Sequence, residues 1–67
     1  MDTAKLELAA QRCREAEEAL EAARSDLRTE AAVALRGADR DGQAAVSRIT
    51  GWSRAYLRKL MRADKAG

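Results

Sequence analysis

From Thr3 to Arg36 the chain contains neither glycine nor proline, and alanine, glutamate, arginine and leucine dominate this stretch. All four residue types favour the α-helix, and nothing in the stretch interrupts one. Asp2 or Thr3 can cap the start of such a helix, and Gly37 can cap its end. The sequence therefore predicts a helix of about 34 residues, which is about 50 Å long at 1.5 Å per residue.

A seven-residue repeat runs through this helix in two interleaved sets of apolar or small residues. The sets are Leu6, Cys13, Leu20 and Leu27, and Ala9, Ala16 and Ala23. This spacing is typical of the a and d positions of a coiled coil. The alternative is a lone helix that folds back on its own domain, but the helix is far longer than the rest of the chain. We therefore expect the seam to hold a homodimer together.

The orientation of the two helices can be argued from the volume of each layer. In an antiparallel pair centred near residue 18, Leu20 faces the partner's Ala16, so the layers have similar volumes and pack evenly. Lys5 then faces the partner's Asp26. A parallel pair stays open, but we favour the antiparallel one. Cys13 distinguishes the two, because its thiols share a layer only in the parallel pair and lie about 15 Å apart in the antiparallel one.

Two shorter helical patterns follow in the segment Gln43–Leu60, which reads QAAVSRITGWSRAYLRKL. One face of the first pattern is formed at helical spacing by Val46, Ile49 and Thr50. Gly51 ends this pattern, since a tight turn needs a positive φ that glycine adopts cheaply.

The second pattern starts after Ser53, a residue suited to cap a helix N-terminus. Leu57 and Leu60 are expected to face back towards the first pattern, with Trp52 packing beneath both. The outward face is then mostly basic. Residues 1–36 hold six Lys or Arg against eight Asp or Glu, whereas residues 37–67 hold seven against three. This uneven charge is what a phosphate-binding surface requires.

Residues 27–62, with the turn Thr-Gly-Trp-Ser-Arg, resemble the small helix-turn-helix DNA-binding proteins of high-GC actinobacteria. The resemblance implies an all-α fold, in which residues 1–36 form a dimerisation helix and residues 27–36 double as the first helix of a head. Residues 37–42 would be a loop, residues 43–63 the helix-turn-helix and residues 64–67 a tail. Its recognition helix, residues 53–62, would enter the major groove.

The expected DNA contacts fall into two groups. Arginine matches the O6 and N7 acceptors of guanine, so the base-reading group comprises Arg54, Arg58, Arg62, Ser53 and Ala55, with Arg54 and Arg58 foremost. The group expected to hold phosphates comprises Gln43, Arg48, Tyr56 and Lys59.

Several functions are disfavoured by composition. The chain has no histidine and one cysteine, and no constellation of catalytic residues or phosphate-cradling loop is visible, so we expect neither an enzyme nor a metal or other cofactor. Asp41 is interpreted as a helix cap. No transmembrane run, signal peptide or ligand pocket is evident, which predicts a cytoplasmic, nucleoid-associated protein.

Together these patterns predict a homodimeric, sequence-specific double-stranded DNA-binding protein, and the resemblance to helix-turn-helix proteins implies a role in transcription regulation. Two alternatives stay open. One is a coiled-coil adaptor whose C-terminal helices bind a protein, with the acidic N-terminal helix as a further docking surface. The other is RNA binding, for which the chain lacks stacking aromatics.

Overall fold

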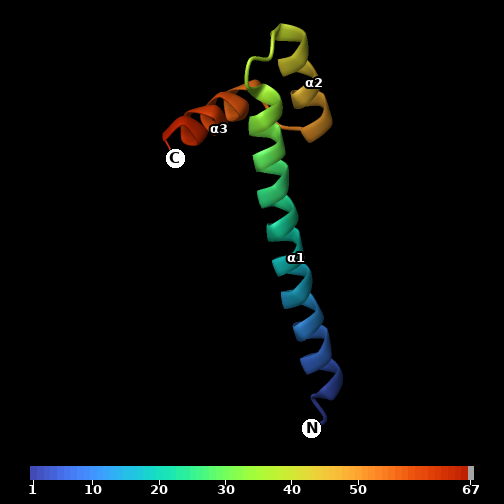
Figure 1. The fold of residues 1–67 in the computed structure, drawn as a ribbon. Helices are drawn as coiled ribbons and strands as arrows, with labels where there is room; N and C mark the ends of the chain where they lie inside the picture. The colour runs from blue at the N-terminus through green and yellow to red at the C-terminus, as the bar shows by residue number, and fades with distance from the viewer. Residues whose placement is uncertain (67) are drawn as a thin grey trace.

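The computed structural model describes the backbone of residues 1–66 and the side chains of residues 1–64. Three helices make up its regular structure: α1 (Ala4–Leu35), α2 (Arg40–Thr50) and α3 (Arg54–Ala66). α1 forms a rod, and α2 and α3 lie on either side of its C-terminal end (Figure 1). The described chain extends 60 × 25 × 16 Å. The predicted all-α fold with a long N-terminal helix is confirmed.

Local features define both ends of α1: a side-chain hydrogen bond at its start and a glycine after its last turn. The backbone N–H of Ala4 donates to the Asp2 carboxylate over 2.9 Å, while the Thr3 hydroxyl binds Glu7 and does not cap the backbone. At the other end Gly37 has a φ of 71°, a left-handed conformation that ends the helix at low cost because glycine has no Cβ.

α2 begins three residues earlier than the sequence predicted. Asp39, not Asp41, is its N-cap: the Asp39 carboxylate accepts the backbone N–H of Gly42 over 2.8 Å. Asp41 lies within the first helical turn, where its negative charge interacts favourably with the positive end of the helix dipole. Because residues 40–42 are helical, the expected loop over 37–42 is shorter than predicted.

The turn between α2 and α3 is held by side-chain hydrogen bonds. Gly51 has a φ of 77°, as predicted for a glycine that ends a helix. The Ser47 hydroxyl donates to the Trp52 carbonyl over 2.7 Å, and the Trp52 N–H donates to the Thr50 hydroxyl over 3.1 Å. These bonds satisfy backbone groups that the two helices leave unpaired, so the turn has a defined shape.

Ser53 caps α3 as predicted. Its hydroxyl accepts the backbone N–H of Tyr56 over 3.1 Å, and its carbonyl accepts that of Leu57 over 3.0 Å. The cap fixes where α3 starts, and therefore which of its residues face the other two helices.

A small apolar core joins the three helices. It consists of Ala31, Leu35, Val46 and Leu57, with Trp52, Leu60 and Met61 packed against it. One expectation was wrong: Ile49 is 75% exposed and is not part of this core. Ile49 lies about 60° to one side of Val46 around the helix, and Thr50 lies about 40° to the other side. α2 packs on the side of Val46 and Thr50, which leaves Ile49 exposed.

The last residues of α3 also differ from the prediction. α3 continues to Ala66, so most of the expected tail is helical. Asp64 binds Arg36 through an ion pair of 3.1 Å, which ties α3 to the end of α1. Gly67 lies outside the described residues.

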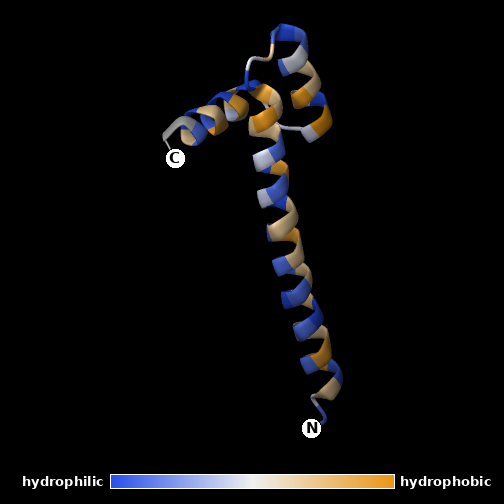
Figure 2. Ribbon diagram, viewed as in Figure 1, coloured by the Kyte–Doolittle hydropathy of each residue, from blue (hydrophilic) through white to orange (hydrophobic). Residues whose placement is uncertain are grey.

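The rod before residue 31 has no buried residue. Apolar and hydrophilic stretches alternate along it, and hydrophobic stretches of the ribbon also lie where α1, α2 and α3 meet (Figure 2). The chain thus divides into a rod and a small head, which comprises residues 31–66.

We expect Asp39→Ala to lower the free energy of unfolding by about 1 kcal/mol, because the Gly42 N–H loses its acceptor. Asp41→Ala is the matched control, since it removes an acidic group from the same helical turn without removing the cap bond. Urea unfolding at fixed protein concentration measures both. A larger loss for Asp41→Ala would contradict the assignment of the cap.

Leu57→Ala should destabilise the head by about 2–5 kcal/mol, because Leu57 is 3% exposed and its truncation leaves a cavity. Ile49→Ala removes a similar side chain from an exposed position and should change stability by about 0.5 kcal/mol or less. Trp52 is the single tryptophan and lies in the head, so its fluorescence follows the transition. Equal effects of the two variants would contradict the core described above.

Candidate nucleic-acid interface

Three arginines form a row along one flank of α3. Arg54, Arg58 and Arg62 are spaced four residues apart, and each step of four turns only about 40° around a helix and rises about 6 Å. All three side chains are exposed. Because Leu57 is buried, the roll of α3 is fixed, and the row lies to one side of the core-facing direction.

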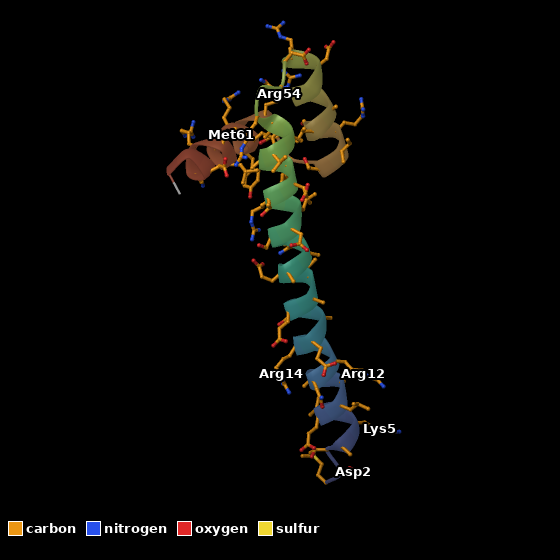
Figure 3. The ribbon with its side chains drawn as sticks, in the orientation of Figure 1. Asp2, Lys5, Arg12, Arg14, Arg54 and Met61 are labelled. Carbon is orange, nitrogen blue, oxygen red and sulfur yellow. The ribbon has the colours of Figure 1, made fainter. Side chains whose placement is uncertain are left out.

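This row borders a hollow of about 360 Å³ at the end of α1. The hollow is lined by Leu35, Gln43, Arg54, Leu57, Arg58, Met61 and Arg62. Its floor is apolar and its rim is cationic, and none of the described residues that line it is acidic. Figure 3 shows Arg54 beside the C-terminal end of α1, with Lys5, Arg12 and Arg14 towards the opposite end.

No carboxylate neutralises the arginine row within the part of the chain whose side chains are described. The ion pairs there are Arg28 with Glu21 and Arg36 with Asp64, and neither includes an arginine of the row. Three like charges along one helix flank repel one another by a few tenths of a kcal/mol per neighbouring pair. A bound anion would relieve that repulsion, so the row favours anionic ligands.

The opposite flank of α3 faces the rod. A second hollow of about 350 Å³ lies there, and its lining residues are Leu60, Ala63 and Asp64 of α3, Arg28, Thr29, Ala32 and Val33 of α1, and Arg36 just after α1. The arginine row, by contrast, shares its hollow with Leu35, the last residue of α1, and with the first turns of α2. The row therefore points along the rod axis, away from the N-terminus of α1.

Two of the predicted DNA contacts lie on the outermost face of α3. Lys59 and Ala55 are each two residues from Leu57, about 160–200° around the helix, and both are exposed. Ser53 is also exposed, but its hydroxyl is engaged as the cap of α3. These residues adjoin the arginine row without lining the hollow.

Two other predicted contacts lie away from the hollow. Tyr56 packs on Trp52, with ring centroids 5.0 Å apart and an interplanar angle of 57°. Tyr56 and Arg58 are two residues apart and therefore point to nearly opposite sides of α3. Arg48 is exposed on α2, about 200° around from the buried Val46. Of the four predicted phosphate contacts, Gln43 lines the hollow with the arginine row, and Lys59 adjoins the row on α3 without lining the hollow.

Sequence reasoning missed the apolar floor of the hollow. No role was predicted for Leu35 or Met61, yet both line the hollow with Leu57. Met61 follows Leu57 by four residues, and this spacing was the signal that could have placed it on the same flank. The position of Leu35 depends on how α1 meets α3, which local spacing does not report.

The predicted seam residues are all exposed in the chain: Leu6, Ala9, Cys13, Ala16, Leu20, Ala23 and Leu27. Leu6 is 70% exposed and Leu20 is 51% exposed. No other segment of the described chain covers them, so a stripe of apolar and small side chains is left open along the rod. We call this set the α1 stripe.

No protein-family model, curated protein or solved structure matches this chain at a significant level. Within residues 1–66, none of the helices combines the length and the apolar character that crossing a membrane requires.

Proposed function

We propose that this protein binds double-stranded DNA in a sequence-specific manner and regulates transcription as a homodimer. In this proposal α2 and α3 act as a helix-turn-helix, and α3 is the recognition helix that enters the major groove. The observation that carries the proposal is the row of three arginines, which form no ion pair with any side chain of residues 1–64, on a helix at the far end of the head.

The dimensions of α3 suit this role. Its 13 residues span about 20 Å, and the major groove is about 12 Å wide, which admits a helix with its side chains. Arg54, Arg58 and Arg62 are assigned to base edges, because a guanidinium can donate two hydrogen bonds to guanine. Ala55 and Ser53 would lie close to the bases without strong donors of their own.

Phosphate contacts would come from residues that flank this row. Gln43 is in the first turns of α2 and lines the same hollow, and its amide donates to the Ala38 carbonyl over 3.4 Å. Lys59 is exposed on the outer face of α3. Arg48 and Tyr56 lie outside the hollow, so they would reach only phosphates further along the duplex.

A second function, that of a protein-binding adaptor, is favoured by one specific observation. The floor of the hollow is formed by Leu35, Leu57 and Met61, and apolar surface contributes little to contacts with phosphates. An acidic amphipathic helix would use both the floor and the arginine rim. DNA binding remains the better-supported proposal, because the row extends from Arg54 to Arg62, about 12 Å, with its cations unpaired.

Binding measured across a range of salt concentrations tests the proposal against both alternatives. Duplex DNA should bind with an affinity that falls steeply as salt rises, because bound phosphates release counterions. An adaptor would show no such affinity, and an RNA-binding protein would prefer structured RNA to duplex DNA. Sequencing the genomic fragments that the protein retains would then identify the cognate site.

Arg58→Ala should weaken binding to that cognate site by about 1–3 kcal/mol and relax base preference at one position. Arg14→Ala is the matched control, since Arg14 is an exposed arginine on the rod. Competition between cognate and random duplexes gives the measurement. If the two variants lose equal affinity, the arginine row does not read bases.

Lys59→Ala should weaken cognate and random DNA alike, because a phosphate contact carries no sequence information. The slope of log affinity against log salt should fall in magnitude by about 0.9, the value for one phosphate. A selective loss at the cognate site would instead assign Lys59 to a base.

A further inference from the structure

The α1 stripe is an apolar helix face that this chain leaves without a partner. The residues of α1 that are buried within the chain are Ala31, Ala32 and Leu35, all at the end that meets the head. Leu6, Leu20 and Leu27 lie on the stripe and are among the exposed large hydrophobic residues. A helix with an open apolar stripe is stabilised when a second helix covers it.

Charges beside the stripe indicate what covers it. Lys5, Glu17, Arg24 and Asp26 are exposed, and none of them forms an ion pair within the described chain. In a second copy that runs antiparallel about residue 18, Lys5 meets the partner's Asp26 and Glu17 meets the partner's Arg24. Symmetry makes each contact occur twice, giving four attractive pairs.

A parallel second copy satisfies fewer of these charges. The attractive pair in that register is Arg12 with the partner's Glu17, which also occurs twice. Exposed pairs contribute about 0.2–1 kcal/mol each, so the difference is a bias that adds to the packing of the layers. In the antiparallel pair, Leu20 faces the partner's Ala16 and Leu27 faces the partner's Ala9, so these layers have similar volumes and pack evenly. The second copy, antiparallel, is therefore the occupant that the stripe fits.

The direction of the arginine row gives this orientation a consequence for DNA. The row points along the rod axis, away from the N-terminus of α1, because its hollow is bounded by Leu35, the last residue of α1. The opposite flank of α3 instead shares a hollow with Arg28, Thr29, Ala32 and Val33, which precede Leu35 along the rod. In an antiparallel pair the two rows point in opposite directions. Leu35 and the partner's Leu35 are then about 50 Å apart along the rod.

We propose that the antiparallel dimer bridges two DNA duplexes, one at each end of the rod. This inference rests on the proposed DNA-binding function and concerns how the dimer uses it. One straight duplex cannot bind both arginine rows of the dimer when the rows face away from each other. A parallel dimer would place both rows at the same end of the rod, where they would contact neighbouring half-sites of a single duplex.

Disulfide formation under mild oxidation tests the orientation without DNA. Cys13 of the wild-type chain should crosslink slowly, because the two thiols lie about 15 Å apart in the antiparallel dimer. Ala23→Cys should crosslink rapidly, because the introduced thiol faces the partner's Cys13. The control is Cys13→Ala combined with Ala23→Cys, which should again crosslink slowly. Rapid crosslinking of all three proteins indicates a parallel pair, and slow crosslinking of all three indicates no dimer; either result overturns the proposal.

Bridging itself is measured by capture of a second duplex. A random-sequence duplex is immobilised, the protein is bound at low salt, and retention of a free labelled duplex is recorded. The wild-type protein should retain it. Leu20→Glu places a charge in the stripe and should abolish retention while single-duplex binding persists. Leu8→Glu is the matched control, because Leu8 is exposed but off the stripe, and it should retain the second duplex like the wild type.

The outcomes separate the bridging proposal from the proposed function. If the wild-type protein binds the immobilised duplex but retains no second duplex, bridging is wrong and DNA binding stands. If it does not bind the immobilised duplex, DNA binding fails and bridging fails with it, while the crosslinking pattern still reports the orientation of the dimer.

Discussion

The burial of Leu57 between the end of α1 and α2 determines how the head presents its charge. Leu57 is 3% exposed, and helix geometry then fixes the direction of every other side chain on α3. Gly51 ends α2 and Ser53 caps the start of α3, so the position of Leu57 along and around α3 is fixed. With Leu57 inside, Arg54 and its two successors at four-residue spacing lie along the flank that faces away from the rod. A small apolar contact therefore positions the whole cationic surface.

The rod and the head depend on different interactions. The head is held by a few apolar side chains, by the hydrogen-bonded turn before α3 and by the ion pair between Arg36 and Asp64. The rod before residue 31 has no buried residue, and it is supported by helix propensity and by exposed side-chain pairs such as Arg28 with Glu21. An isolated helix in water is marginal, so a partner helix would add the packing that the rod lacks. The acidic rod and the basic head also keep their charges at opposite ends of the molecule.

Much of this arrangement could be predicted from sequence because its signals are local. The long helix follows from a stretch without glycine or proline, and the turn follows from Gly51 and Ser53, whose backbone roles are specific. The start of α2 was missed because Asp39 and Asp41 are both plausible caps, and the geometry of the loop decides between them. Ile49 was misplaced because its spacing fits a helix face, while the angle at which α2 meets α1 decides which face is covered. The hollow beside Leu35 depends on tertiary packing, which no local pattern encodes.

The proposed function requires duplex DNA to bind at the arginine row and not along the acidic rod. A titration of ¹⁵N-labelled protein with duplex DNA, followed by amide and arginine side-chain resonances, tests this claim residue by residue. The largest shifts are expected on residues 54–62 and on Gln43, with little change along residues 5–24. Shifts concentrated on the rod, or their absence from residues 54–62 when DNA is bound, would contradict it.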